Sequence, residues 1–254
     1  MTPTARTVAV VQARLGSSRL PRKVLAPLAG APLLQRTLER VMRVPGVDAV
    51  CVASPRADGP DEIDAIVDRL DGVELFRGSE TDVLRRTLDA AAGCGATTVV
   101  RITSDCPLVD PDVAGAVVAA QSATGADYAR TSFRHGFPLG FDTEVFSFSA
   151  LTAADAETSD PYEREHVTPF LWRQPERFAA IFLEHVPDLR HWRLTVDTPE
   201  DLSLVQTIYE RLHASHPTFG FAELKLLLQR APELLLINKD VAQHPFVGVP
   251  DATP

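Results

Sequence analysis

Short apolar runs rich in β-branched residues alternate with segments of helical periodicity through the first half of this 254-residue chain. Four such runs are predicted strands, at residues 8–11, 49–53, 73–76 and 97–103. Between them apolar residues recur at the spacing of one helix face, and Pro60 and Asp110-Pro111 are typical helix starts. Strands that alternate with helices of this length form right-handed crossovers. The pattern therefore predicts an α/β fold with a mainly parallel sheet and helices on both faces.

The second half of the chain is less regular. Further strands are predicted at residues 127–131, 143–148, 178–184 and 192–196, and helices at 163–173, from Pro199 to 212, and at 221–236. No linker separates two autonomous units, so we predict one domain over residues 1–238. Residues from about 130 to 185 are predicted to form an insertion at one sheet edge. Residues 239–254, which include three prolines, are predicted to be a loosely held tail.

Composition argues against several classes of protein. The net charge of -9 and the pI near 5.3 leave no general basic face for nucleic acid. Cys51, Cys94 and Cys106 have no paired C-x-x-C spacing, which argues against a disulfide framework. The chain starts with a short polar stretch and carries no long apolar run. We therefore expect a soluble, cytoplasmic protein that binds neither nucleic acid nor membrane.

The first predicted strand continues directly into a basic loop. Arg14, Arg19, Arg22 and Lys23 fall within ten residues, with Gly16, Ser17 and Ser18 among them. Small residues let backbone N–H groups approach an anion closely, arginine forks match phosphate oxygens, and lysine adds a compact charge. The loop is neither a Walker A motif nor G-x-G-x-x-G. It predicts a polyphosphate site at the end of a strand, where open α/β sheets bind nucleotides; a solvated basic loop is the alternative.

Two aspartates follow later predicted strands. Asp105 lies in R-I-T-S-D-C-P-L and Asp197 in R-L-T-V-D-T-P-E-D-L, at the same expected sheet edge as the basic loop. Mg²⁺ is usually held by one or two carboxylates together with phosphate oxygens and water, so this pair is a candidate magnesium site. Alternatively, Asp105 starts a turn and Asp197 precedes a helix capped by Thr198. Glu200 and Asp201 are expected to be surface acids that complement the helix dipole.

Several motifs that occur in one order carry a family resemblance. They are V-V-Q-A-R-L-G-S-S-R-L-P-R-K, F-R-G-S-E-T-D-V-L-R-R, V-R-I-T-S-D-C-P-L-V-D-P, E-V-F-S-F, R-E-H-V-T-P-F and L-T-V-D-T-P-E-D-L. Together, over residues 7–212, they resemble the family of the spore-coat polysaccharide biosynthesis protein F. That family is related to the cytidylyltransferases that activate acylneuraminate and 3-deoxy-manno-octulosonate. The resemblance implies a single Rossmann-like nucleotidyltransferase domain, CTP and Mg²⁺, release of pyrophosphate, and a homodimer formed largely through the insertion.

The resemblance also implies roles for particular residues. Arg14, Arg19 and Lys23 would hold the triphosphate and, with Asp105, form the catalytic set. Asp105 and Asp197 would bind Mg²⁺. Further nucleotide contacts would come from Gln12 and Ala13, beside the base, and from Gly16, Ser17, Ser18, Gly78, Ser79 and Ser104.

The acceptor is expected to bind near the insertion. The candidate acceptor residues are Arg134, His135, Asp142, Glu144, Glu165 and His166. Related proteins often carry an arginine in P-R-G-x-D, where this chain has P-L-G-F-D, so Leu139 replaces a cation and suggests a different acceptor. Arg134 or His135 could compensate. Glu165 and His166 could instead fix a helix at the dimer contact.

The implied reaction is in-line attack of an acceptor oxygen on the α-phosphorus, with positioning and charge neutralisation as the protein's share. Three functions stay open. The first is CMP transfer from CTP to a small acidic acceptor, foremost a sugar acid. The second is CTP-dependent transfer to a non-sugar acid such as a phosphonate. The third is a sugar-transferring or non-catalytic nucleotide-binding protein of the same fold; Asp110-Pro111-Asp112 has the D-x-D spacing of such enzymes but fits a helix start better.

Overall fold

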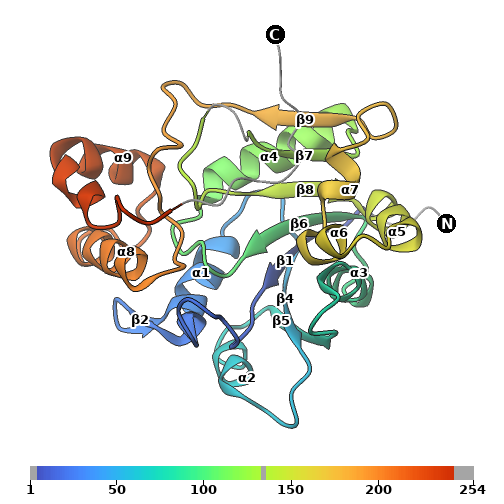
Figure 1. Cartoon of the computed structure of the whole chain (residues 1–254), viewed down its shortest axis with the longest axis horizontal. Coiled ribbons are helices and arrows are strands. Elements are labelled where there is room, and N and C mark those ends of the chain that lie inside the picture. Colours follow the sequence, from blue (N-terminus) through green and yellow to red (C-terminus); the bar gives the residue numbers. More distant parts are fainter. Residues whose placement is uncertain (1–4, 133–135, 243–254) are drawn as a thin grey trace.

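The structure, a computed structural model, describes residues 5–132 and 136–242 (Figure 1). Its main sheet has seven strands in the order β5-β4-β1-β6-β8-β7-β9. The strands are β1 (Thr7–Gln12), β4 (Ala49–Pro55), β5 (Val73–Gly78), β6 (Thr98–Thr103), β7 (Tyr128–Thr131), β8 (Glu144–Ser147) and β9 (Ala180–Leu183), and β2 (Pro27–Leu28) pairs with β3 (Ala31–Pro32) separately. The helices are α1 (Leu33–Val41), α2 (Glu62–Val67), α3 (Val83–Gly93), α4 (Pro111–Thr124), α5 (Phe148–Glu157), α6 (Pro161–His166), α7 (Pro169–Trp172), α8 (Pro199–Leu212) and α9 (Phe221–Arg230), with the short 3-10 helices η1 (Lys23–Leu25) and η2 (Pro232–Leu236).

The sheet is mainly parallel, as predicted. β1 pairs in parallel with both β4 and β6, β4 pairs in parallel with β5, and β7 with β9. β8 runs antiparallel to both of its neighbours, β6 and β7. Because β1 and β6 are parallel neighbours, with Gln12 opposite Thr103, the loops that follow them leave from the same edge. The basic loop and the Asp105 loop therefore start side by side.

Both faces of the sheet are covered by helices (Figure 1), which confirms the predicted α/β fold. Side chains alternate along β1, so Val8 and Val10 pack on one face while Ala9 and Val11 pack on the other. The first face is covered by α3, α5 and α7, and the second by α1, α2 and α4. A third apolar cluster joins α8, α9 and η2 to the segment from Leu189 to Val196. Burial on both faces explains why the first strand reads as a continuous apolar run.

Two of the three predicted helix starts are confirmed, and the third lies further along the chain than predicted. Asp110 accepts a hydrogen bond from the Val113 N–H at 2.9 Å and caps α4, with Pro111 in its first turn. Thr198 caps α8 in the same way, and Pro199 opens that helix. Pro60 does not open α2; Asp61 is its cap, because its carboxylate accepts from the Ile63 N–H at 2.8 Å. The D-x-D spacing at 110–112 is thus a helix start.

The second half departs further from the sequence prediction. Residues 192–196 are not a strand, because their backbone groups bond to loops: the Leu194 N–H donates to Leu139 O at 2.8 Å and the Val196 N–H to Asp105 O at 2.8 Å. The predicted helix 163–173 is split into α6 and α7 at Val167, whose φ is 72°. The predicted strand at 143–148 ends at Ser147, where α5 begins. The helix predicted at 221–236 divides into α9 and η2.

Two further predictions concern the C-terminal tail and membrane-spanning helices. The tail predicted at 239–254 lies outside the described residues from position 243 onward. Within the part of the chain that the structure describes, no helix combines the length and apolar character needed to span a membrane.

Candidate active site

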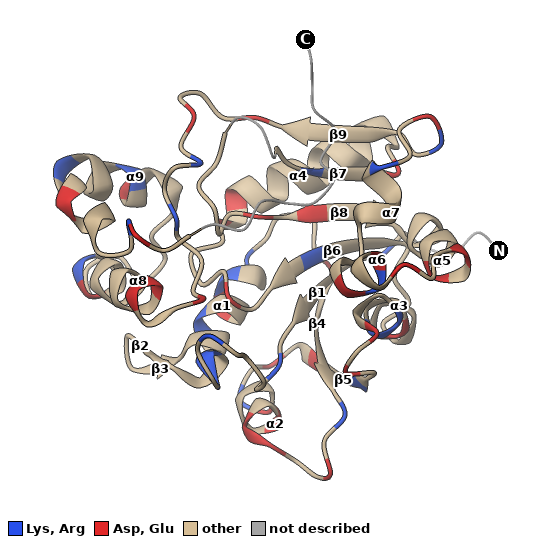
Figure 2. Ribbon diagram, in the orientation of Figure 1, with Lys and Arg blue, Asp and Glu red and all other residues tan. Residues whose placement is uncertain are grey.

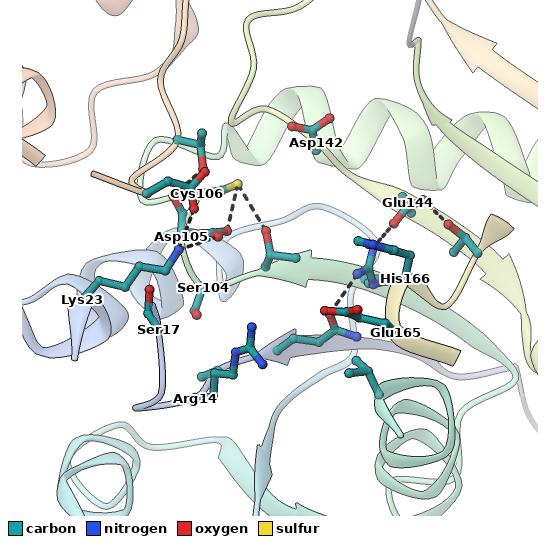
Figure 3. Close-up of a pocket in the computed structure, with 18 of the residues that line it drawn as sticks. Arg14, Ser17, Lys23, Ser104, Asp105, Cys106, Asp142, Glu144, Glu165 and His166 are labelled. Atoms are coloured by element: carbon teal, nitrogen blue, oxygen red, sulfur yellow. Dashed lines mark hydrogen bonds and ion pairs between the residues drawn. The ribbon is translucent and has the colours of Figure 1, made fainter. Parts of the chain in front are cut away.

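A pocket of about 460 Å³ lies at the carboxyl edge of the parallel strands. Its walls come from the loop after β1, the ends of β6 and β8, helices α3 and α6, and the segment 193–197. Figure 3 shows Lys23, Ser104 and Asp105 on one side, Glu144, Glu165 and His166 on the other, and Arg14 between them. In the ribbon of Figure 2 the loop between β1 and α1 carries basic residues, whereas acidic and basic residues are interspersed along most other segments. The topology thus gathers residues from both halves of the chain.

Lys23 joins the basic loop to both predicted metal-binding aspartates. Its Nζ donates to Asp105 Oδ2 at 2.8 Å, to Asp197 Oδ1 at 2.9 Å and to the Val196 carbonyl at 2.9 Å. Burial alone would lower the pKa of Lys23, but the two carboxylates outweigh it and raise the pKa. The prediction that Asp105 and Asp197 converge on the basic loop agrees with this geometry.

Asp197 is surrounded by three cations. Besides Lys23, its carboxylate pairs with Arg19 at 3.2 Å and with Arg193 at 2.9 Å. Burial would raise the pKa of Asp197, yet these cations hold it below its usual value, so the side chain is an anion at neutral pH. Asp197 therefore joins three cations of the pocket, in addition to preceding the Thr198 helix cap.

Asp201 corrects a sequence expectation. It is fully buried rather than a surface acid, and it accepts from Arg193 Nε and Nη2, each at 2.9 Å. It also accepts from Asn238 Nδ2 at 2.8 Å and from the Asp197 N–H at 3.0 Å. Asp201 thus anchors the turn that presents Asp197, whereas Glu200 is exposed as expected. The T-P-E-D pattern hid this role because an acid at that position also completes a capping box.

The two aspartates fit the chemistry of a divalent cation. One carboxylate oxygen from each converges on a single cationic atom, Lys23 Nζ, and oxygen is the donor that Mg²⁺ prefers. Within residues 5–132 and 136–242 no group of three or more His, Cys, Asp or Glu side chains could hold a metal by itself. A cation bound by Asp105 and Asp197 would therefore depend on further oxygens, such as those of a phosphate ligand.

Most of the predicted nucleotide contacts line the pocket. These residues are Gln12, Ala13, Arg14, Gly16, Ser17, Ser18, Arg19, Lys23 and Ser104. Gln12 is held firmly, because its Nε2 donates to Thr87 Oγ1 at 2.8 Å and its Oε1 accepts from Arg101 Nη2 at 3.0 Å. Arg22 points elsewhere and pairs with Glu62.

Gly78 and Ser79 are not among the lining residues; instead they position one. The Ser79 carbonyl accepts from Arg86 Nη1. A Cβ on Gly78 would lie 2.8 Å from Arg86 Cγ, so only glycine leaves room for this arginine. The G-S pair therefore acts on the pocket through Arg86.

The predicted acceptor residues divide into two sets. Asp142, Glu144, Glu165 and His166 line the pocket, as does Leu139. Arg134 and His135 lie at 133–135, outside the described residues. Leu139 therefore lies on a wall of the pocket, at the position where the family resemblance leads us to expect an arginine.

Glu144 is saturated with partners. Its Oε1 accepts from Tyr128 and Thr168 hydroxyls, each at 2.6 Å, and its Oε2 pairs with Arg101. Burial would raise its pKa, but the charges of Arg101 and Arg130 together with these hydrogen bonds lower it to about 2. Glu144 is therefore fitted to hold Arg101 in place rather than to exchange a proton.

Sequence reasoning missed the arginines Arg86, Arg101, Arg130 and Arg193, all of which line the pocket. Two of them carried a signal: Arg101 and Arg130 each interrupt an apolar strand, in V-V-R-I-T and Y-A-R-T. A charged residue inside a buried strand is rare unless it is paired or functional. Arg86 and Arg193 carried no such signal, because each follows ordinary helix or loop residues.

The turn between α6 and α7 brings α6 to the pocket. Val167 is fully buried at φ 72° and ψ −56°, and the Thr168 N–H donates to His166 O at 2.9 Å, which closes a γ-turn. A β-branched residue in this conformation is strained. The same turn carries Thr168 to Glu144 and places Glu165 and His166 on the pocket wall.

A mainly parallel α/β sheet with a cationic pocket and two converging aspartates at its carboxyl edge is the arrangement of a nucleotide-binding protein. Comparison with known proteins makes the class specific. The cytidylyltransferase family model matches residues 8–238. The chain belongs to the cytidylyltransferase family.

Individual relatives agree with this assignment. The spore coat polysaccharide biosynthesis protein SpsF of Bacillus subtilis is 31% identical over 231 residues, covering 88% of this chain and 94% of that protein. A 3-deoxy-manno-octulosonate cytidylyltransferase of Anaeromyxobacter dehalogenans is 36% identical over 235 residues, covering 78% of this chain and 96% of that protein. The solved structure of a cytidylyltransferase from Leptospira borgpetersenii has a TM-score of 0.87 at 29% identity and covers 95% of this chain and 100% of its own. The resemblance and the fold expected from the motifs are thus confirmed.

Proposed function

We propose that this chain transfers CMP from CTP to a small acidic acceptor, foremost a sugar acid, with release of pyrophosphate and with Mg²⁺ as cofactor. The observation that carries the proposal is the position of Lys23 between Asp105 and Asp197 in a pocket at the sheet edge. The name of the 3-deoxy-manno-octulosonate cytidylyltransferase relative supports both the nucleotide and the class of acceptor.

The chain's own residues would act by position and charge. Arg14, Arg19 and Lys23 would hold the β- and γ-phosphates, so that the bond from the α-phosphorus to pyrophosphate breaks as the acceptor oxygen attacks in line. Asp105 and Asp197 would hold Mg²⁺, which supplies neutralisation of phosphate charge. No side chain is assigned as a general base.

The proposed acceptor wall, formed by Asp142, Glu144, Glu165 and His166, also carries two arginines, the kind of donor that an anionic acceptor would use. Arg101 and Arg130 enter the pocket from β6 and β7. Leu139 on the same wall favours a second candidate, CTP-dependent transfer to a non-sugar acid such as a phosphonate, because the cation expected there for a sugar acid's carboxylate is absent from that position. The sugar-transferring alternative has no comparable support, since Asp110 is a helix cap.

The first experiment is a thermal shift with each nucleoside triphosphate and Mg²⁺, because a ligand that binds the native state raises its stability. We expect the largest shift with CTP. We expect Asp105→Ala to abolish the Mg²⁺-dependent part of that shift, whereas Glu200→Ala, an exposed acid beside the same site, should keep it. A shift with a nucleotide sugar and with no triphosphate would refute the proposal. Pyrophosphate release with a panel of sugar acids and phosphonates then identifies the acceptor.

We further propose that the enzyme works in the cytoplasm as a homodimer. Cys51, Cys94 and Cys106 are buried free thiols, as in proteins of reducing compartments.

A further inference from the structure

Within the described residues, one buried arginine of the pocket forms no ion pair with an acid. Arg86 is 3% exposed, and within the described part of the chain no ion pair joins it to a carboxylate. Arg101, Arg193 and Arg19, by contrast, each pair with an acid of the site. A buried guanidinium without a counter-ion is costly unless a ligand supplies acceptors.

The Arg86 side chain is fixed but incompletely satisfied. Its Nη1 donates to the carbonyls of Ser79 and Glu80, the latter at 3.2 Å, while its buried Nε meets no acceptor in the structure. Asp82, the nearest acid along the helix, is already engaged by Arg164 and by the Arg85 N–H. Gly78 leaves the space that the side chain occupies. The fold thus fixes the Arg86 guanidinium through Nη1 and leaves its Nε without an acceptor.

The strand order indicates which part of a nucleotide lies at Arg86. Arg86 stands on α3, which follows β5 at one end of the sheet, whereas Asp142, Glu144 and Arg130 belong to strands on the far side of β1 and β6. The Lys23 cluster rises from the loops after β1 and β6. A nucleotide with its phosphates at Lys23 and its acceptor toward β8 therefore has its base on the α3 side.

Other donors on that side are already committed. The Gln12 amide is bound at both ends, by Thr87 and Arg101, and Val83, one turn before Arg86 on the same face of α3, is apolar. Burial and the nearby charge of Arg14 lower the pKa of Arg86, and the opposing charges of Asp82 and Glu80 do not make up for this. Arg14 is exposed and is proposed to hold phosphate, so Arg86 is the buried guanidinium on this side of the pocket that has donors left for a ligand.

We infer that Arg86 is a specificity-determining residue that reads the base of the nucleotide. Because Nη1 is committed to the Ser79 and Glu80 carbonyls, the donors left on Arg86 are Nε and Nη2, which point in parallel and match two adjacent acceptors. Cytosine offers such a pair in O2 and N3. Uracil carries an N–H at position 3, so the same fork would meet a donor. The inference rests on the proposed function, because it assumes a cytidine nucleotide in the pocket.

The test is titration calorimetry of CTP, UTP and inorganic tripolyphosphate, each with Mg²⁺ and without acceptor. We expect wild-type protein to prefer CTP over UTP. Arg86→Met should weaken CTP binding about 10- to 100-fold, the range of one or two charge-assisted hydrogen bonds, and bring the CTP to UTP ratio close to one. Tripolyphosphate binding should be unchanged. Arg85→Met is the matched control, since Arg85 is the exposed neighbour on α3.

Arg86→Lys covers the case in which the methionine variant does not fold. Lysine keeps the charge and the stem but not the fork, so this variant should bind tripolyphosphate normally and lose selectivity for CTP. An equal loss for tripolyphosphate and CTP would overturn the inference in favour of a phosphate contact, and unchanged selectivity in both variants would show a purely structural role. Wild-type protein that does not prefer CTP would instead contradict the proposed function.

Discussion

At the scale of single residues, the pocket depends on charges that are held in pairs. Glu144 fixes Arg101, Asp201 fixes Arg193, and Asp105 and Asp197 share Lys23. Such pairs keep long side chains in one orientation, which is what a site that works by position requires. Removing one member leaves the other charge buried without compensation.

The pH dependence of stability should report on Glu144. Its pKa falls from 4.5 to about 2 on folding, so its contribution is complete above pH 4.5 and is lost as the pH falls toward 2. The shift corresponds to about 3 kcal/mol. Urea denaturation of wild type and Glu144→Gln at several pH values should show a stability difference that is large at pH 7 and shrinks below pH 4. A difference independent of pH would contradict this role.

At the scale of elements, the turn before α8 shows how a helix start serves the site. Asp201 accepts hydrogen bonds from the backbone of Asp197 and Thr198 and pairs with Arg193. The capping box therefore both begins α8 and sets the orientation of Asp197. A cap that is buried in this way contributes more than the usual surface cap.

Asp201→Asn should consequently destabilise the protein by about 2–4 kcal/mol, because it removes the counter-ion of a buried arginine. Glu200→Gln, in the same helix turn but exposed, should stay within about 0.5 kcal/mol of wild type. Chemical denaturation measures both. Since Arg193 also contacts Asp197, Asp201→Asn should in addition weaken Mg²⁺-dependent CTP binding. Equal stability of the two variants would rule out the anchoring role.

The elements also show where sequence reasoning succeeds and fails. The strands and helices up to α4 were predictable because burial on one or both faces leaves an apolar period in the sequence. The segment 192–196 also alternates apolar residues, but Trp192, Leu194 and Val196 pack in the cluster beneath α8 and not in a sheet. Periodicity records which side chains are buried and not what their backbone pairs with.

The site was predictable to a similar extent. Lys23 and Asp105 could be brought together from the order of strand ends, because β1 and β6 are parallel neighbours. The prediction for Asp197 rests on a strand at 192–196 that the structure does not contain, and hydrogen bonds to Leu139 O and Asp105 O bring that segment to the same edge instead. Arg86 could not be predicted, because its position depends on two carbonyls and on the space beside Gly78, and neither leaves a trace in local composition. Tertiary contacts of this kind decide the details of a pocket once the topology has placed its walls.

At the scale of the whole molecule, the insertion is part of the sheet and also forms its edge. β9 ends the sheet beyond β7, and Phe182 on this strand is 43% exposed. An edge strand with an exposed aromatic residue is a site at which another chain can pack. This agrees with the homodimer that we propose.

Light scattering coupled to size exclusion should therefore give the mass of two chains for wild type, close to twice 27.6 kDa. Phe182→Asp should shift the population toward one chain without unfolding it, because the side chain is only partly buried. Leu226→Asp, which changes a similarly exposed residue on α9, serves as the control and should leave the mass unchanged. A monomeric wild type, or a dimeric Phe182 variant, would contradict the proposed contact.

The antiparallel strand β8 has a mechanical consequence. It hydrogen-bonds directly to β6, so the strand that leads to Asp105 and the strand that begins with Glu144 belong to one continuous sheet. The pocket wall at Asp105 and the pocket wall at Glu144 are therefore joined through one hydrogen-bonded sheet, and we expect them to keep their separation. We expect any opening and closing for ligands in the parts outside the sheet, chiefly the basic loop and α6, and crystals soaked with successive ligands should show those two segments moving while the sheet stays fixed.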